Sequence, residues 1–447
     1  MDELELRDTV VSEARHTIII SGGGLVGLSV ALLLAEGLPP SVRIHVLESR
    51  GRAPANDRES CAGNFDARST ALSYSTYQIY EQINVWRKLA PLLAPIKSIH
   101  VSRRNRFGSS QLHAVDQGWD ALGWVAENEL LADVLLDAVQ AKDQISVSFG
   151  VKISSVEPTA TGFSVTTTCS DGEPMAGHPR SEQTVRSDGP SASANGTKAS
   201  KQSVDLLIVA EGAGSELRSR LGIDSRRTSY RQHALIANLS FRGTQQSIAF
   251  ERFTADGPLA LLPLPSSGNE SRMALVWTLP QDKAAQLQHA SHEAFSSALV
   301  QEFGHRLGSP THLGERSVFP LSLVESKEQV RRGCVILGNA AHSLHPVAGQ
   351  GFNLSMRDAA ALVAYVKQGV EIGSGPGDLT YLSAYATARL DDQVQTIQAS
   401  DQLPELFMRS DPVLSIARDL ALAGLDLIPQ ARRHFIREAA GNAALER

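Results

Sequence analysis

The residues best suited to chemistry lie between Val335 and Asp358, in the stretch VILGNAAHSLHPVAGQGFNLSMRD. His342 and His345 carry the side chain whose ordinary pKa best suits acid–base work near neutral pH. They stand in a loop rich in residues that break regular structure, namely Pro346, Gly349 and Gly351. A loop of this kind that feeds a helix aims free backbone N–H groups and a positive dipole end at its occupant. The stretch therefore predicts a site for an anionic group. An ordinary strand–loop–helix connection is the alternative.

Two elements must position this loop. Val335–Leu337 predicts a short buried strand, which Gly338 ends. From about Phe352 the pattern turns helical. Its apolar residues lie on or near one face: Leu354, Ala359, Leu362 and Val366.

A second glycine-rich turn follows the first predicted strand, His16–Ile20. A helix, Leu28–Glu36, and a second strand, Val42–Leu47, complete a βαβ unit. The turn carries a G-x-G-x-x-G motif made of Gly22, Gly24 and Gly27. Glu48 ends the second strand, about 20 residues beyond the glycines, where dinucleotide sites place an acid for ribose hydroxyls. The unit predicts a dinucleotide site that FAD or NAD would satisfy, and a glycine-rich turn in an unrelated α/β protein is the alternative.

Further α/β elements follow. Arg68 lies ahead of a helix, where it could meet a phosphate or ribityl oxygen or be a solvated arginine beside a helix cap. A Gly-rich turn, 211–218, follows the apolar strand Val204–Ala210 and suits another part of a cofactor. The remaining predicted elements are a helix, Glu129–Gln140, and two strands, Ile145–Ser148 and Phe163–Thr168.

Three regions depart from this pattern. Residues 171–203 have almost no large apolar side chains and predict a flexible surface insertion. Apolar runs from Leu235 to Leu279 predict an antiparallel sheet, whose apolar content fits a greasy substrate and core packing equally. Two C-terminal helices, within 381–403 and 411–440, are predicted to pack on the body. A membrane-surface or partner-binding helix is the alternative for the second one, because its apolar stripe ends in arginines.

Composition excludes several classes of protein. The chain has 447 residues, a 42% apolar share and a 20% charged share, as a globular protein does. A net charge of −6 gives no reason to expect nucleic acid. Cys61, Cys169 and Cys334 are too few and too scattered for a disulfide frame or a zinc site, so reduced thiols in the cytosol are expected. The acidic N-terminus lacks a signal-peptide core, and no apolar run is long enough to cross a bilayer.

Three stretches in this order resemble a known family: GGGLVG with Glu48, LLIVAEGAGSELR, and LGNAAHSLHPVAGQGFNLSMRD. They are similar to the single-component FAD-dependent aromatic hydroxylases, the group built like p-hydroxybenzoate hydroxylase. Within it, FDARSTALS and FERFTADGPLALLPL look like the ubiquinone-biosynthesis hydroxylases, nearest to the 2-polyprenyl-6-methoxyphenol hydroxylase branch. The resemblance covers the chain except the insertion.

The resemblance implies an α/β fold: a Rossmann-like FAD-binding domain, an inserted antiparallel-sheet substrate domain, and C-terminal helices. The FAD-binding domain is expected at 16–90, 118–225 and 326–390. The substrate domain is expected at 91–117 and 226–325, and the helical region at 391–447.

The resemblance also assigns site residues. Those expected to contact FAD are Gly22, Gly24, Gly27, Glu48, Arg68, Asn128, Glu211, Gly212, Asn339, Gly349, Gly351, Phe352 and Asn353. Two of them depart from the family pattern, since Glu211 replaces an Asp and Asn339 replaces an acid outside this branch. Backbone N–H groups near Gly351 would stabilise negative charge on reduced flavin. Pro346 would shape the oxygen-reaction pocket, and His345 is the candidate catalytic base, with His342 as a second candidate and a hydrogen-bonded loop histidine as the alternative for both.

The implied function is hydroxylation of a polyprenylated phenol in ubiquinone biosynthesis through a flavin C4a-hydroperoxide. The alternatives are an FAD-dependent oxidase or dehydrogenase, and a non-catalytic lipid-phenol-binding member of a quinone-synthesis complex. No second complete G-x-G-x-x-G marks an NADPH domain, so either NADPH or a protein donor would supply electrons. Expected partners are the phenol and O2, with a biosynthetic complex or a homo-oligomer compatible with the family. The expected location is the cytoplasm, with peripheral contact to the inner membrane left open.

Overall fold

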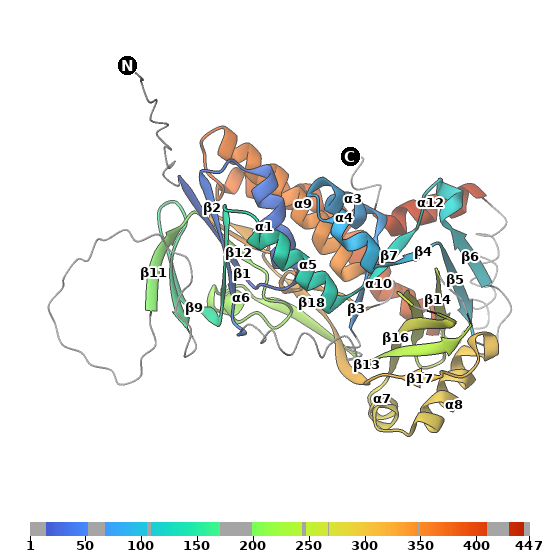
Figure 1. Ribbon diagram of the computed structural model, residues 1–447. Coiled ribbons are helices and arrows are strands. Elements are labelled where there is room, and N and C mark those ends of the chain that lie inside the picture. The colour runs from blue at the N-terminus through green and yellow to red at the C-terminus, as the bar shows by residue number, and fades with distance from the viewer. Residues whose placement is uncertain are drawn as a thin grey trace, which may run out of the picture.

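The structure is a computed structural model that describes residues 15–51, 68–104, 109–169, 199–243, 247–266, 268–346, 349–408 and 429–441. One part of it is built around a six-stranded, mostly parallel sheet, and the other around a larger sheet (Figure 1). Across the described ranges, every helix falls short, in length or in apolar character, of what a bilayer crossing requires.

The six-stranded sheet has the order β19-β20-β12-β1-β2-β8. Its strands are β1 (His16–Ser21), β2 (Val42–Glu48), β8 (Ile145–Phe149), β12 (Leu206–Val209), β19 (Val330–Arg331) and β20 (Cys334–Ile336). Neighbouring strands are parallel, except that β19 and β20 pair antiparallel. The predicted βαβ unit and the strand predicted ahead of Gly338 are both confirmed.

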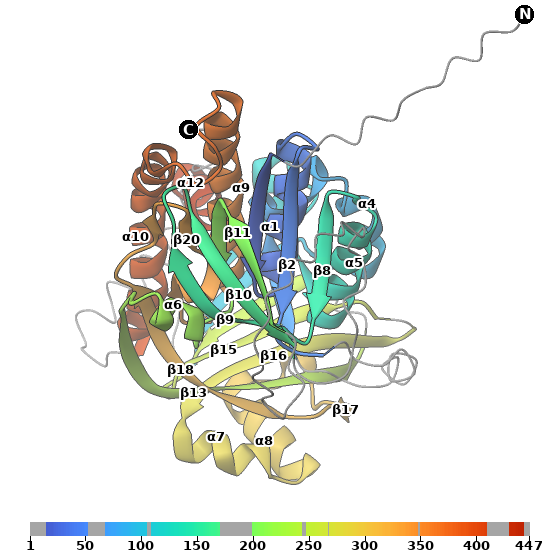
Figure 2. The ribbon, with the colours of Figure 1, turned by 90° about the vertical axis from the view of Figure 1, so that its left-hand side faces the viewer.

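Both faces of this sheet are covered, which explains the continuous apolar runs in its strands. The helices α1 (Leu25–Gly37), α5 (Asn128–Gln140) and α9 (Gln350–Glu371) lie on one face (Figure 2). Ile18 and Ile20 point into the core shared with these helices, and Ile19 points to the opposite face. A three-stranded sheet covers that opposite face: β9 (Val151–Pro158), β10 (Phe163–Cys169) and β11 (Ala199–Val204).

The insertion predicted at 171–203 is wrong at its C-terminal end. Residues 199–203 belong to β11, which pairs antiparallel with β10. This strand has a polar sequence, ASKQSV, and lies at the edge of its sheet, where little burial is needed. Residues 170–198 lie outside the described part of the chain.

The large sheet has the order β21-β18-β13-β16-β15-β14-β5-β6, with β17 paired to β13. Its strands are β5 (Ser98–Arg103), β6 (Ser109–His113), β13 (Ser225–Arg242), β14 (Ile248–Phe253), β15 (Pro258–Leu264), β16 (Glu270–Pro280), β17 (His312–Leu313), β18 (Ser317–Ser326) and β21 (His342–Ser343). The strands pair antiparallel, as predicted, except that β14 and β5 are parallel. The exception arises because β5 and β6 enter the sheet from a separate, earlier stretch of the chain.

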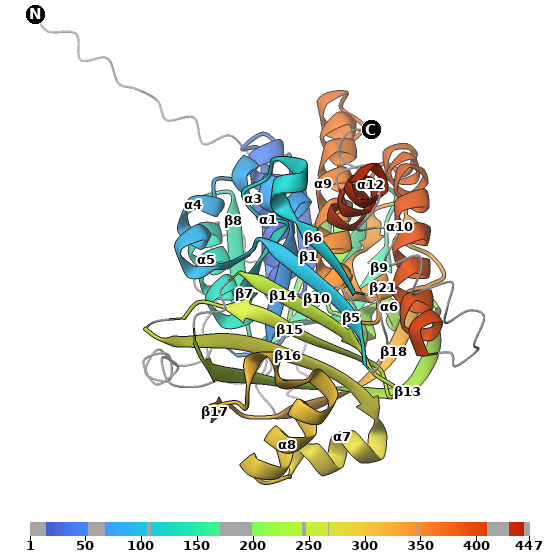
Figure 3. The same ribbon diagram turned by 90° about the vertical axis from the view of Figure 1, so that its right-hand side faces the viewer.

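The two faces of the large sheet have different neighbours. The helices α7 (Gln281–Gln288) and α8 (His292–Phe303) cover one face, where Phe250 packs against Phe303 (Figure 3). On the other face, which we call the inner face, Ala249 and Ala274 share a cluster with Val125. Val125 belongs to β7 (Gly123–Glu127), which forms a small sheet with β3 (Ser69–Ser73) and β4 (Ala94–Ile96). The inner face is therefore turned towards the parallel-sheet part.

The C-terminal helices join the two parts. The long helix α10 (Leu379–Met408) packs on α9 and also contacts β14 of the large sheet. The last helix, α12 (Pro429–Ala440), packs through Ile436 against residues of β6 and η2 (Ala114–Gln117). Of the second helix predicted at 411–440, residues 411–428 lie outside the described residues, and the rest packs on the body as predicted. The remaining short elements are α3 (Tyr74–Gln82), α4 (Trp86–Leu89), η1 (Ala90–Leu92), α6 (Glu216–Arg220), η3 (His305–Leu307) and η4 (Gly338–Ala340).

Candidate cofactor and substrate site

The N-terminal glycines form a cradle with an open side. Gly22 has φ +112°, and a Cβ there would lie 2.5 Å from the Ala210 carbonyl oxygen. A Cβ on Gly27 would lie 1.9 Å from the Gly22 oxygen, so both positions require glycine. A Cβ on Gly24, by contrast, would meet nothing within 4 Å among the described residues. Gly24 is also the N-cap of α1, which has no side-chain cap and no acid in its first turn. This helix end fits a pyrophosphate, because its free N–H groups and dipole favour an anion.

Glu48 lies beside this cradle, and its carboxylate accepts hydrogen bonds from the backbone of the protein. Its Oε2 accepts a hydrogen bond from the Gly23 backbone N–H at 2.8 Å, and its Oε1 accepts one from Arg50 N–H at 2.9 Å. A carboxylate has about four lone-pair positions, so ribose hydroxyls can still bind. The structure adds that Glu48 holds the glycine turn in place.

Glu211 and Gly212 follow β12, beside the same turn. Glu211 Oε1 accepts from Ser21 Oγ at 2.6 Å, and Oε2 accepts from Ser215 Oγ at 2.7 Å and Leu217 N–H at 3.2 Å. The longer side chain that replaces Asp therefore ties the end of β1 to the start of α6. Gly212 has φ +89°, and a Cβ there would meet nothing within 4 Å in the described structure.

Arg68 and Asn128 are 60 residues apart in sequence and adjacent in the structure. The pairing of β3 with β7 brings them together, and the Asn128 N–H donates to the Arg68 carbonyl at 3.0 Å. Asn128 Oδ1 accepts from Thr70 Oγ1 at 2.7 Å. Glu127 is turned towards the large sheet, where its Oε1 pairs with Arg272 Nη2 at 2.8 Å. This ion pair, which the sequence analysis did not find, fixes the small sheet to β16.

Asn353 joins the start of α9 to β3 and α3 through its side-chain amide. Its Oδ1 accepts from Ser73 N–H and Thr76 Oγ1, both at 2.8 Å. Its Nδ2 donates to the carbonyls of Ala71 at 2.8 Å and Gly349 at 2.9 Å. An amide offers two donors and about two acceptor positions, so none remains for a ligand. Any contact of Asn353 with a cofactor is therefore made by its backbone.

Asn339 lies where the two uncapped helix ends meet. The N-cap of α9 is Gly349, with φ +60°, no side-chain cap and no acid in the first turn. A Cβ on Gly351 would lie 4.0 Å from Asn339 Oδ1, and one on Gly338 would lie 3.2 Å from Val26 in the first turn of α1. Asn339 itself is exposed, and Phe352 is partly buried. The glycine cradle, Asn339 and the start of α9 therefore lie next to one another.

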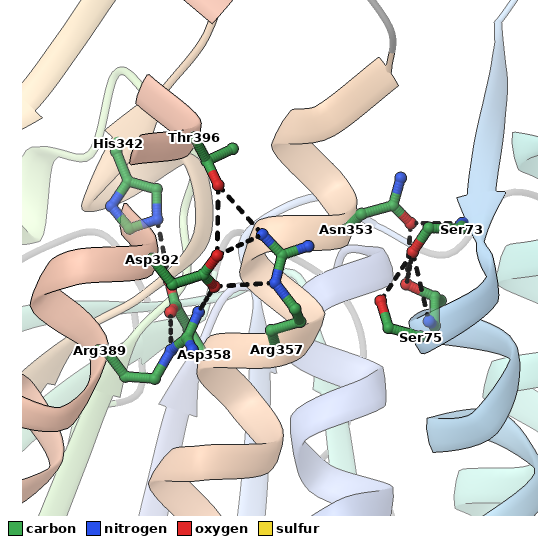
Figure 4. Close-up of polar contacts among 10 residues, drawn as sticks. Ser73, Ser75, His342, Asn353, Arg357, Asp358, Arg389, Asp392 and Thr396 are labelled. Carbon is green, nitrogen blue, oxygen red and sulfur yellow. Dashed lines mark hydrogen bonds and ion pairs between the residues drawn. The ribbon is translucent and has the colours of Figure 1, made fainter. Parts of the chain in front are cut away.

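His342 is part of a buried polar network. Its Nε2 lies 3.0 Å from Asp358 Oδ2, and the two side chains are 1% and 0% exposed. Asp358 Oδ1 accepts from Arg389 Nε at 2.7 Å. Asp392 binds both Arg389 and Arg357, whose Nε donates to it at 2.8 Å (Figure 4). Through His342, the network ties the loop to α9 and α10. The adjacent Arg357-Asp358 pair in the sequence is the only local sign of it.

His345 is buried against the large sheet. Its ring meets that of Tyr230 edge-on at 5.1 Å, and its carbonyl accepts from Ser400 Oγ at 3.0 Å. Burial lowers the pKa of His345 to about 4, although Asp401 acts in the opposite direction. The neutral ring is therefore a weak base. Pro346, next to it, is partly buried, and its carbonyl accepts from the Gly349 N–H at 3.1 Å.

The comparisons with known proteins agree with this geometry. A model of the FAD binding domain family matches residues 15–400. The ubiquinone hydroxylase UbiL of Rhodospirillum rubrum is 28% identical over 432 residues, which cover 96% of this chain and 90% of the relative. The mitochondrial ubiquinone biosynthesis monooxygenase COQ6 of Homo sapiens is 24% identical over 461 residues, which cover 94% of this chain and 92% of the relative.

A solved structure shows the same fold. The p-nitrophenol 4-monooxygenase PnpA from Pseudomonas putida DLL-E4 matches with a TM-score of 0.71 at 15% identity, covering 95% of this chain and 99% of that one. The predicted fold class is confirmed by this likeness. Because the family model spans most of the sequence, the chain belongs to the FAD binding domain family, as its resemblance to the FAD-dependent aromatic hydroxylases predicted.

Proposed function

We propose that this chain is an FAD-dependent monooxygenase that hydroxylates the aromatic ring of a polyprenylated phenol in ubiquinone biosynthesis. Membership of the FAD binding domain family supports the cofactor. The names of the relatives, a ubiquinone hydroxylase and ubiquinone biosynthesis monooxygenases, support the reaction and the substrate class. The methoxyphenol branch of these substrates is also part of this proposal.

One observation carries the proposal. The uncapped N-termini of α1 and α9 meet at η4, and the inner face of the large sheet is turned towards the same part of the molecule. The first feature suits the two anionic regions of FAD, its pyrophosphate and its reduced ring. The second supplies an apolar wall for a greasy aromatic substrate.

FAD, once bound and reduced, would activate O2 and supply one oxygen atom to the ring. The protein binds and orients. The N–H groups at Gly24 hold the pyrophosphate, Glu48 the ribose, and Arg68 with Asn128 the middle of the cofactor. The N–H groups at Gly351 and Phe352 stabilise negative charge near the flavin ring. Asn339 lies beside them, where its amide meets the sugar-alcohol chain.

Other predicted site residues position the elements that form the site. Glu211 positions the end of β1, and Asn353 positions the start of α9. Pro346 and His345 form the loop that packs against Tyr230 of the sheet. This loop and the apolar inner face keep water from the reacting atoms.

The reductant is NADPH at a transient surface site or a protein donor. Anaerobic mixing of the purified holoprotein with NADPH distinguishes these sources, because direct use bleaches the flavin absorbance with saturable kinetics. We place the protein in the cytoplasm, in peripheral contact with the inner membrane or with a ubiquinone-biosynthesis complex, where a prenylated substrate can be reached.

The decisive experiment supplies the reduced holoprotein with ¹⁸O₂ and a short-chain polyprenyl methoxyphenol. Mass spectrometry should show one ¹⁸O atom in the product. Absence of a labelled product would favour an oxidase or dehydrogenase, and release of hydrogen peroxide would point to the oxidase. A purified protein that takes up no FAD would support the non-catalytic alternative. Deletion of the gene in its host should cause the matching phenol precursor to accumulate.

A further inference from the structure

The inner face of the large sheet carries a cross-strand row of side chains that are not fully buried. The register places Glu251 of β14 opposite Ala260 of β15 and Val101 of β5. Ala260 lies opposite Val276 of β16, which lies opposite Ile236 of β13. All five side chains are partly accessible.

The next row on the same face is more buried, although its Ile99 and Leu262 stay partly accessible. It contains Ala249 and Ala274, which are 3% and 0% exposed and pack against Val125 of the small sheet. The side chains between the two rows, such as Phe250 and Leu261, point to the other face and are buried under α8. The row around Glu251 therefore lies on the inner face, one row away from the side chains that pack against β7.

Glu251 is the one ionisable residue in this otherwise aliphatic row. No hydrogen bond or ion pair is made by it within the described structure. Arg103 lies two residues beyond Val101 on β5, and the shift in the pKa of Glu251 has no contribution from a charged neighbour. Burial alone raises the pKa of Glu251 to about 7. An unpaired carboxyl group on an apolar wall is costly to the fold, and such a group is a candidate for contact with a bound ligand.

We propose that Glu251 receives the phenolic hydroxyl of the substrate and accepts its proton, an inference that rests on the proposed function. The phenol O–H bond breaks and an O–H bond forms on the carboxylate, while the electron pair stays on the phenol oxygen and enriches the ring carbons ortho and para to it. The site carries one negative charge before and after the transfer, so no second charge is buried. Neither predicted histidine suits this task, because His342 is held by Asp358 and His345 is a weak base.

The test compares wild type with Glu251→Gln and Glu251→Asp, with Glu270→Gln as the control. Glu270 is an exposed glutamate at the start of β16 in the same sheet. The reduced holoproteins are mixed with the phenol and O2, and the single-turnover rate of hydroxylation is measured against pH. Glu251→Gln should hydroxylate about 10²-fold more slowly, which is the typical contribution of a general base. Its FAD content and its dissociation constant for the phenol should stay within a few-fold of wild type.

Glu251→Asp should recover part of the rate, and Glu270→Gln should match wild type. The ultraviolet difference spectrum of the bound phenol gives a readout that a merely structural role would not move. In wild type it should contain a phenolate component, which Glu251→Gln should lose. Hydroxylation by Glu251→Gln at the wild-type rate and pH profile would overturn the role of Glu251 alone. A wild type that binds FAD but leaves the phenol unhydroxylated would overturn the proposed function, and this role with it.

Discussion

His342 Nε2 lies 3.0 Å from Asp358 Oδ2 in a region closed to solvent. Burial raises the pKa of Asp358, but contacts with His342 and Arg389 outweigh it and hold this pKa below its ordinary value. Removing the Asp358 carboxylate leaves the buried guanidinium of Arg389 with less negative charge around it. We expect Asp358→Asn to lower the free energy of unfolding by about 3–5 kcal/mol.

Urea unfolding followed by circular dichroism measures this loss. The matched control is Asp224→Asn, since Asp224 pairs with Lys327 while both side chains are mostly exposed. Exposed pairs contribute about 0–1 kcal/mol. Equal losses in the two variants would contradict a stabilising network around His342.

Replacing Asn353 should weaken FAD binding, although its side chain makes no direct contact with the cofactor in the proposed site. Asn353→Ala removes four hydrogen bonds, of which three connect α9 to β3 and α3 and the fourth holds the Gly349 carbonyl at the start of α9. The start of α9 should shift, and the FAD dissociation constant should rise at least tenfold by fluorescence titration. Ser355→Ala is the control, because its buried hydroxyl bonds only within α9, to the Gly351 carbonyl. An unchanged FAD affinity in Asn353→Ala would show that these hydrogen bonds do not position the FAD site.

The glycine cradle and the parallel sheet could be predicted from the sequence because their signals are local. A strand, three glycines and a terminal acid stand within 35 residues of one another in positions 16–48. The partners of Glu127, Glu211 and His342 could not be predicted. Their contacts join segments far apart in the chain, and a carboxylate has the same sequence signature whether it meets a ligand or a neighbouring strand. The row around Glu251 depends on the register of five strands, which no local pattern specifies.

His345 makes stability depend on pH. Its pKa is about 4 in the folded protein, against an ordinary 6.5. Between these pH values His345 is protonated in the unfolded chain but neutral in the folded protein. The free energy of unfolding therefore falls as the pH falls from 6.5 to 4. The shift of 2.5 units (6.5 − 4) corresponds to at most about 3 kcal/mol.

Urea unfolding of wild type and His345→Gln at several pH values in this window checks the expectation. In this pH window, the free energy of unfolding of His345→Gln should change less steeply with pH than that of wild type, by the equivalent of up to one bound proton. His292→Gln, a change at an exposed histidine on α8, should keep the wild-type slope. Parallel slopes in wild type and His345→Gln would contradict the burial of a neutral ring.

Substitutions at Gly24 can test FAD binding by the glycine cradle without disturbing the fold. Its φ of −74° and ψ of −176° suit any residue, and a new Cβ meets open space among the described residues. Both Gly24→Asn and Gly24→Asp should therefore fold, because each residue is a good N-cap for α1. The two side chains have nearly the same shape and differ in charge. Asp places a carboxylate where the pyrophosphate is proposed to bind, so Gly24→Asp should bind FAD at least tenfold more weakly than Gly24→Asn. The measurement is FAD titration by fluorescence at low and high salt, and screening should narrow the difference. Equal affinities would place the pyrophosphate away from the start of α1.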